Sequence, residues 1–447
     1  MVNTLLLILA WAIYLVSFWL HVRSRRMTIW MGLNIGIMHL VLVPFSVFAF
    51  KGGLSGDPGG VIPSVDWADN GPAVLRILTM IIAYGTWNLV RLLIQSTPPP
   101  IQDLDLEPSF WDSLQAVRVS HLIIVFVVAA FGLYLLASMG AGGGHWAHAK
   151  GEFLIAYGTP AILALSMVNA IRLTILIVLA SLYFQDRIKL KRYLILMGIV
   201  CVVDLYTTGT RIFTLQTLVT TVALLMVRRQ WFQFGMLSLA MIPFGILMTM
   251  FSLIRVYMHN WSGGGLSSAG AALNEGYLEA KDYFLPDLGI PEFLMGVSEG
   301  INANVLVVVV EDFHSMMGML WGIGILRGFV FWIPRSLWPG KPENLTILIG
   351  RNLMGGDNTS MGATIFGEFW ANFGLLGFAM IPVVMYCVNL LLRKTIRNPT
   401  MHTVAAFIFG YSVVRMPVSD FTVLFLFVIL LLNITRLPSR SNGLLNQ

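Results

Sequence analysis

The stretch IPRSLWPGKP at Ile333–Pro342 places two cations among three prolines, in a chain that is otherwise largely apolar. Each proline fixes its own φ and moves the preceding residue out of helical geometry, so the stretch predicts a stiff extended turn. Trp338 suits an anchor at a membrane interface, where Arg335 and Lys341 would meet lipid headgroups. Guanidinium and ammonium groups held in this way favour a phosphate or diphosphate ligand.

More basic residues fall on the same predicted side of a membrane. Arg211 opens a predicted span, Arg255 ends another, and Arg415 lies near the end of a third, shortly before Asp420. Charges in or near lipid are costly and tend to mark sites. The residues predicted to bind substrate are Arg211, Arg255, Arg335, Lys341, Arg415 and Asp420. Two structural alternatives stay open, namely snorkelling of arginines at helix ends and anchoring of Arg335 and Lys341 to anionic lipid.

Composition indicates the kind of fold that must position these residues. Of 447 residues, 57% are hydrophobic and only 11% are charged, whereas a soluble domain carries about 25% charged residues. A chain so poor in charge cannot cover a soluble surface of this size. We therefore predict an all-α, polytopic transmembrane helical bundle that forms one domain, 1–447. The net charge of +6 does not indicate nucleic-acid binding, because in membrane proteins an excess of basic residues usually comes from the cytoplasmic loops.

A span needs roughly 20 mostly apolar residues, and the chain holds about eleven such runs, within a range of roughly ten to twelve. They are 3–21, 28–50, 73–95, 119–139, 160–184, 192–208, 211–228, 231–254, 365–392, 401–418 and 420–436. With this count, the basic loops all fall on one side, which is cytoplasmic by the positive-inside rule. These loops are 22–26, 186–192, 228–229, 393–397 and 436–440. The N-terminus is then outside and the C-terminus inside.

A long segment, 255–364, separates the eighth and ninth predicted spans on the outer side and is expected to be partly helical and interfacial. Its apolar part, 304–334, holds charged residues, so we expect helices that lie in or dip into the outer leaflet. Within the fifth span, Arg172 is expected to be buried with a polar partner.

Three short motifs resemble the pattern of Wzy-type O-antigen polymerases. IPRSLWPGKP is followed by GATIFGEFWANFGLLG at 362–377, which is similar to their Gly-Glu-aromatic helix. TTGTR at 207–211 resembles their Gly-Ser-Arg-like junction, and VVRMPVSD at 413–420 resembles the arginine-containing end of their late helix. The resemblance covers about 205–425, and by motif position it includes Arg211, Arg335, Lys341, Glu368 and Arg415, with Arg255 matching more loosely. The usual layout of the family has one more N-terminal span.

The resemblance implies a glycosyltransferase of the GT-C-like class in the bacterial inner membrane, with its active site facing the periplasm. Such enzymes polymerise undecaprenyl-pyrophosphate-linked oligosaccharide repeat units, as in lipopolysaccharide biosynthesis. The implied partners are this lipid-linked oligosaccharide and membrane lipids. Whether a chain-length regulator also binds stays open, as do the sugars and their linkage.

Glycosyl transfer requires an activated acceptor hydroxyl and a stabilised leaving group. Because the leaving group is a diphosphate, Arg and Lys are sufficient to stabilise it, and the sequence predicts no metal and no cofactor. The catalytic candidates are Asp312, His314 and Glu368, and Asp420 is a fourth and less favoured candidate for the general base. Glu368 has two alternatives, which are to orient an arginine or to cap a helix, and His314 has the alternative of an ordinary loop histidine.

Two other functions stay open. An O-antigen ligase, which moves glycan to the lipid A core, would have a similar fold, and a catalytic histidine in the outer segment would favour it. A transporter or flippase is less favoured. Such proteins often show internal repeats and charges at the midplane of the membrane, whereas this sequence shows no repeat and its charges cluster on one predicted side.

Overall fold

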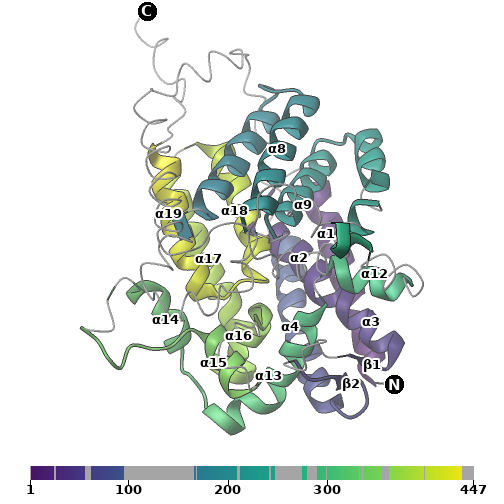
Figure 1. Ribbon diagram of the computed structural model, residues 1–447, viewed down its shortest axis with the longest axis vertical. Coiled ribbons are helices and arrows are strands. Elements are labelled where there is room, and N and C mark those ends of the chain that lie inside the picture. The colour runs from purple at the N-terminus through teal and green to yellow at the C-terminus, as the bar shows by residue number, and fades with distance from the viewer. Residues whose placement is uncertain are drawn as a thin grey trace, which may run out of the picture.

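The structure, a computed structural model, describes most of the chain outside 95–165 and 247–273. The described residues are 2–24, 27–55, 62–94, 166–167, 169–208, 212–240, 243–246, 274–278, 289–298, 300–331, 333, 337–354, 362–396 and 398–434. They are mostly helical, as the sequence predicts, and Figure 1 shows the helices gathered into one bundle.

Most helices run along the long axis of the bundle, and shorter ones lie at its lower end (Figure 1). Their bounds are α1 Val2–Arg23, α2 Ile29–Ile37, α3 Val43–Lys51, α4 Gly71–Ile94, α8 Leu190–Thr208, α9 Ile212–Val227, α12 Ile290–Val297, α13 Ile301–Met317, α14 Ile323–Val330, α15 Leu345–Asn352, α16 Thr364–Phe373, α17 Gly377–Thr395, α18 Pro399–Val413 and α19 Val418–Ile434. A π-helical turn, Met38–Leu42, joins α2 to α3, and a 3₁₀ turn, Gly374–Leu376, joins α16 to α17.

The described strands form one small antiparallel hairpin at the lower end of the bundle (Figure 1). The strand β1, Gly53–Leu54, pairs with β2, Val65–Asp66, so that Gly53 lies opposite Asp66 and Leu54 opposite Val65.

Four helical segments are long and apolar enough to cross a membrane, which makes this a helical membrane protein. They are Val2–Arg23, Ile29–Lys51, Gly71–Ile94 and Thr364–Thr395, close to four of the predicted spans. Shorter apolar helices cover Asn169–Phe184, Ile212–Val227 and Val418–Leu432. The predicted span 119–139 lies outside the described residues. The total of about eleven spans and the outer location of 255–364 therefore stay predictions.

Close backbone contact between α2 and α18 forms the centre of the bundle. A Cβ added to Gly410 would lie 2.0 Å from the carbonyl oxygen of Ile29, and one added to Gly32 would lie 2.1 Å from that of Phe407. Glycine is therefore required on both helices, in the way that small residues let membrane helices approach each other. A buried hydrogen bond from Asn88 to Asn34, 3.1 Å long, ties α4 to the same core.

A buried ion pair links two further helical segments. Arg172, on the helix that covers Asn169–Phe184, pairs with Asp204 of α8, whose side chain is 1% exposed. This confirms that Arg172 has a buried polar partner. Breaking such a pair is costly because one charge would be left alone in an apolar environment.

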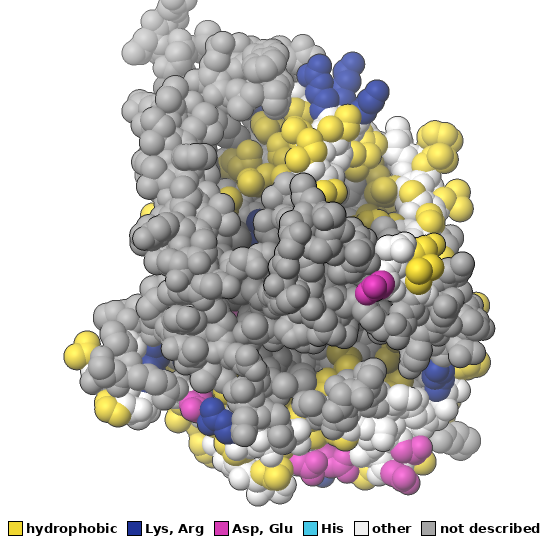
Figure 2. All heavy atoms as spheres, in the orientation of Figure 1, with side chains coloured by type: hydrophobic (Ala, Val, Ile, Leu, Met, Phe, Trp, Pro, Cys, Tyr) yellow, Lys and Arg dark blue, Asp and Glu magenta, His cyan; other side chains and the backbone are white. Residues whose placement is uncertain are grey.

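Charge is distributed unevenly between the two ends of the bundle. Figure 2 shows a group of dark-blue side chains at the upper end, over α8, whereas the lower end, near α13 and the hairpin, shows most of the visible magenta side chains together with some dark-blue ones. We call the upper end the basic end; it carries Arg23, Lys189, Lys191, Arg192, Arg228, Arg229, Arg393 and Lys394. We call the lower end the acidic end; it carries Asp66, Asp69, Glu311, Asp312 and Glu343.

The apolar segment 304–334 forms two helices with different surroundings. Most of α13 lies inside the protein, where Val305–Val310 are all buried and the helix packs against α4 and α16. In contrast, α14 packs one face on α19 and exposes Ile323, Leu326 and Phe329 on the other. Only α14 therefore presents the apolar surface expected of a helix that lies in a leaflet.

Candidate functional site

Two of the sequence motifs meet where α16 begins and where α18 turns into α19. The backbone N–H of Ile365 donates to the carbonyl oxygen of Val414, at 2.9 Å. One turn further along α16, Glu368 Oε2 accepts a hydrogen bond from the backbone N–H of Val418, at 2.5 Å. Residues 50 positions apart in the chain thus form one junction, which we call the α16–α19 junction.

Glu368 is buried, with 1% of its surface exposed, and its carboxylate lies at the first turn of α19. An acceptor oxygen there satisfies a backbone N–H that has no partner within the helix. Glu368 Oε1 has no hydrogen-bond partner among the described residues. The structure therefore gives Glu368 a capping role through one oxygen and leaves the other buried and, within the described part of the chain, without the hydrogen-bond partner that a buried polar atom normally has.

The backbone at the start of α16 adds a sign of constraint. Thr364 has φ of 59°, a left-handed conformation that is an outlier for a β-branched residue. Strain of this kind persists only where the surroundings enforce it, and it clusters at active sites and ligand clamps.

Asp420 lies in the first turn of α19 and binds two side chains from earlier in the chain, one on α14 and one at the start of α15. Its two oxygens accept hydrogen bonds from Asn344 Nδ2 at 2.9 and 3.0 Å, and its Oδ1 lies 3.4 Å from Arg327 Nη1. Asn344 also caps α15, because its Oδ1 accepts from the backbone N–H of Thr346. Asp420 is therefore held in a fixed position, with a third of its side chain exposed.

Arg327 and Asn344 were not predicted as site residues. Arg327 is a charge within an otherwise apolar helix, which is the signal that could have identified it. Asn344 carries no comparable signal, because an asparagine before a helix is an ordinary cap.

Lys341 lies inside the protein and not at its surface. Its side chain is buried, and Nζ donates to the carbonyl oxygens of Phe331 at 2.6 Å and Ile333 at 2.9 Å. These carbonyls follow the end of α14, where backbone acceptors lack helical partners. Lys341 thus stabilises the turn itself, and its position close to Asn344 in the chain keeps it near the α16–α19 junction.

Arg415 is half-buried in the turn between α18 and α19. With Gln216 of α9 and Ser412 of α18, it lines a small cavity. Gln216 Nε2 donates to Ser412 Oγ at 2.9 Å, so this wall of the cavity is polar. Arg415 follows Val414, which binds the start of α16, and it therefore belongs to the junction.

His314 and Asp312 lie on α13, at the acidic end. The ring of His314 stacks on that of Trp370, with centroids 5.1 Å apart, and its Nε2 lies 2.8 Å from the Trp370 carbonyl oxygen. A carbonyl only accepts, so Nε2 carries the proton and Nδ1 is the basic nitrogen. Asp312 is exposed. Among the described residues, neither side chain forms a hydrogen bond or ion pair with Glu368, although α13 packs against α16.

The remaining three predicted residues, Arg211, Arg255 and Arg335, lie outside the described residues. Among the described residues, Glu368, Asp420, Arg415 and Lys341 come from the α16–α19 junction and its immediate neighbours, whereas His314 and Asp312 lie apart on α13. Within the described ranges, no three His, Cys, Asp or Glu side chains are grouped as metal ligands would be.

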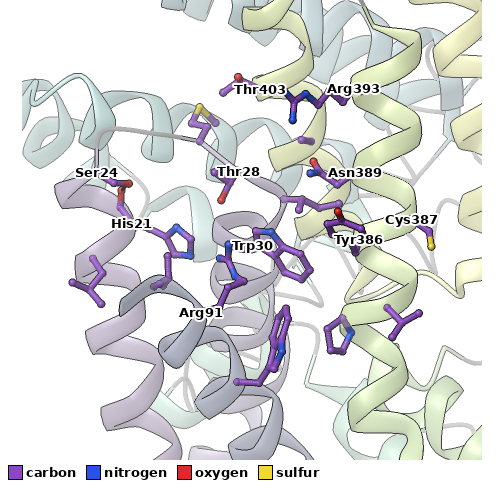
Figure 3. A pocket seen from close by; sticks show the side chains of 18 of the residues that line it. His21, Ser24, Thr28, Trp30, Arg91, Tyr386, Cys387, Asn389, Arg393 and Thr403 are labelled. Carbon is purple, nitrogen blue, oxygen red and sulfur yellow. Dashed lines mark hydrogen bonds between the residues drawn. The ribbon is translucent and has the colours of Figure 1, made fainter. Parts of the chain in front are cut away.

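A second candidate site lies at the basic end. A cavity of about 1320 Å³ opens between the end of α1, the start of α2, the end of α4 and the facing walls of α17 and α18. Figure 3 shows His21, Trp30 and Arg91 on one side of it and Tyr386, Asn389 and Arg393 on the other. This cavity was not predicted, because its residues come from five helices.

The fold is that of a polytopic helical membrane protein, with two candidate sites: the α16–α19 junction toward the acidic end and the cavity at the basic end. No protein-family model, no curated protein and no solved structure matches the chain.

Proposed function

We propose that the protein is a membrane glycosyltransferase that polymerises oligosaccharide repeat units carried on undecaprenyl pyrophosphate. The reaction joins O-antigen-type repeat units at the periplasmic face of the bacterial inner membrane, without a metal. The growing chain leaves its lipid diphosphate and bonds to a sugar hydroxyl of the next lipid-linked unit.

The observation that carries this proposal is the contact between two motifs that resemble those of the polymerase family. GATIFGEFWANFG contributes Ile365 and Glu368, and VVRMPVSD contributes the atoms that they bind, at Val414 and Val418. Motifs distant in sequence that converge on one buried carboxylate are what a shared site requires.

Charge distribution supports the orientation that the proposal needs. The basic end carries the short Lys- and Arg-rich loops, which stay in the cytoplasm in membrane proteins. The α16–α19 junction lies toward the opposite, acidic end, where α13 and α15 are found (Figure 1). On this basis the junction faces the periplasm.

The exposed face of α14 supports access to a lipid-linked substrate. Ile323, Leu326 and Phe329 are 47%, 53% and 58% exposed, and Leu337 in the following turn is 78% exposed. Apolar side chains exposed together in this way suit the boundary between headgroups and acyl chains. Arg327 of the same helix reaches Asp420, so the surface that would meet the carrier is connected to the junction.

The proposed chemistry divides the work between carboxylates and cations. A bond forms between the acceptor oxygen and the anomeric carbon while the bond from that carbon to the diphosphate breaks. A carboxylate, which we assign to Glu368 through Oε1, takes the proton of the acceptor hydroxyl. Arg415 and Arg335 stabilise the negative charge that develops on the departing diphosphate.

The ligase remains a second candidate because of one observation on His314. Its ring is fixed by Trp370 with Nδ1 as the basic nitrogen, which is a suitable state for a general base. A ligase would use the same lipid-linked donor with the lipid A core as acceptor.

The test is polymerisation by the purified full-length protein supplied with lipid-linked repeat units, read as a ladder of chain lengths. Arg415→Ala and Arg335→Ala are each expected to reduce the rate by about 10²-fold or more, the usual effect of removing one charge-stabilising donor. Arg351→Gln is the matched control, because Arg351 is an exposed arginine at the same end that pairs with Glu343 at 3.0 Å.

Three outcomes would contradict the proposal. The first is no ladder from the wild-type protein, and the second is a normal ladder from both alanine variants. The third is transfer only to added lipid A core, which Glu368→Gln leaves unchanged and His314→Ala abolishes; this result would establish the ligase in place of the polymerase.

A further inference from the structure

The cavity at the basic end combines an apolar wall with a concentration of positive charge. Its apolar wall includes Phe378, Pro382 and Val383 of α17, and its aromatic wall includes Trp30 and Trp87. Its volume of about 1320 Å³ exceeds the range of roughly 300–1,000 Å³ that is common for small-molecule pockets. The space is therefore sufficient for an amphiphile with a headgroup and part of its tail.

Arginines line the cavity on both sides. The guanidinium carbon of Arg91 on α4 lies 4.8 Å from the ring centroid of Trp30 and 6.0 Å from that of Trp87. The Nη2 of Arg91 donates to Asn88 Oδ1 at 3.0 Å. Arg393 of α17 and Arg23 of α1 are exposed at the mouth. None of the described lining residues is Asp or Glu, so the lining is complementary to an anion.

Two buried imidazole nitrogens in the lining add a demand for a polar ligand. His21 is 1% exposed, and its Nε2 has no hydrogen-bond partner among the described residues. His402 of α18 is half-buried, and its Nε2 is likewise buried without a hydrogen-bond partner among the described residues. Buried polar atoms are normally satisfied by protein, water or ligand, because an unmade hydrogen bond is costly. Figure 3 shows His21 beside Arg91, at the side of the cavity opposite Arg393.

We propose that this cavity binds an anionic phospholipid of the leaflet at the basic end. The phosphate lies between the α4 wall, which carries Arg91, and the α17 wall, which carries Arg393, with the histidine nitrogens near the glycerol and headgroup oxygens. The acyl chains follow the apolar wall of α17. The site is separate from the α16–α19 junction and does not depend on glycan transfer.

A lipid fits better than a soluble phosphate for two reasons on the lining itself. The cavity opens beside helices that are long and apolar enough to cross a membrane, so its apolar wall continues toward hydrocarbon. The aromatic and cationic groups lie together near the ends of α1 and α4, where Trp and Arg are typical of the headgroup level.

The experiment is a lipid titration of the purified full-length protein followed by native mass spectrometry, with phosphatidylglycerol and phosphatidylcholine as probes. The wild type is expected to retain phosphatidylglycerol preferentially. Arg91→Gln and Arg393→Gln should each weaken that retention about fivefold, which corresponds to about 1 kcal/mol per cation near an anionic headgroup. Arg91→Lys should retain most of the binding, and phosphatidylcholine should be unaffected throughout.

The control is Arg192→Gln, which removes an exposed charge at the basic end outside the cavity. Equal retention of the two lipids by the wild type would overturn the proposal. So would a loss in Arg192→Gln as large as that in Arg393→Gln, because the attraction would then be general to this end. Complete displacement by millimolar inorganic phosphate would also overturn it. If Arg91→Gln fails to fold, the exposed Arg393 decides the outcome alone.

Discussion

The α2–α18 contact allows a prediction whose size follows from the geometry. In Gly410→Ala, the new methyl group would lie 2.0 Å from the carbonyl oxygen of Ile29, 2.9 Å from its carbonyl carbon and 3.0 Å from the backbone nitrogen of Leu33. An ordinary contact is about 3.5–4.0 Å for non-bonded heavy atoms. The two helices must therefore separate by more than 1 Å, roughly the shortfall from such a contact.

The obstructing atoms are backbone, so no side-chain rotation can relieve the clash. Overpacking of this kind costs about 1–3 kcal/mol and sometimes more, and the separation also loosens the packing around Asn34 and Tyr411. We expect Gly410→Ala to be destabilised by about 3 kcal/mol, at the upper end of that range. The assay is unfolding of the purified protein in detergent, induced in one experiment by heating and in another by denaturant.

Gly198→Ala in α8 is the matched control. Among the described residues, no atom beyond the backbone of its own helix lies within 4 Å of a Cβ added there, and alanine stabilises a helix relative to glycine by about 0.5–1 kcal/mol. The control should therefore unfold at the same or a slightly higher temperature. If Gly410→Ala and Gly198→Ala unfold alike, the close approach of α2 and α18 is wrong.

Three further predictions concern the α16–α19 junction. Glu368→Gln keeps an acceptor for the Val418 N–H and should cost less than about 1 kcal/mol of stability, while glycan transfer falls about 10²-fold through loss of the base; full activity would make Glu368 a helix cap and nothing more. Asn344→Asp sets a carboxylate against Asp420 and should destabilise the protein by about 2 kcal/mol after allowance for solvent. Adding Asp420→Asn to that variant should restore the melting temperature, and failure to do so would refute the assigned hydrogen bonds. Lys341→Met removes the donor to two carbonyls, at about 1–3 kcal/mol, and should hasten proteolysis between 331 and 345; unchanged cleavage would refute its role in the turn.

The sequence was sufficient to predict the helical membrane class and several span positions. Apolar run length alone placed the segments beginning near 3, 28, 73 and 365, because lipid demands about 20 apolar residues per crossing. The interruption at Gly374 was not predicted. Glycine is tolerated in membrane helices, and nothing in the local pattern indicates that its φ would be positive, at 58°.

The site was predictable only in part. Glu368 was identified from a short motif and Asp420 from its place just after Arg415 at the end of a predicted span, and the structure brings both to the first turn of α19. The inward orientation of the Lys341 side chain was not predictable, because the carbonyl oxygens that accept its hydrogen bonds come together only when the turn after α14 has formed. The cavity at the basic end depends on which faces of five helices meet, and single-helix hydropathy carries no information on that.

The 3₁₀ turn at Gly374–Leu376 divides the 32-residue segment Thr364–Thr395 into two helices with different surroundings. The first helix, α16, packs against α13 and α14 and is hydrogen-bonded to the start of α19. The second, α17, forms one wall of the opening at the other end of the bundle. We therefore expect a tilt of α17 to be taken up at the turn between the two helices, so that it would change the width of that opening without moving the carboxylate of Glu368.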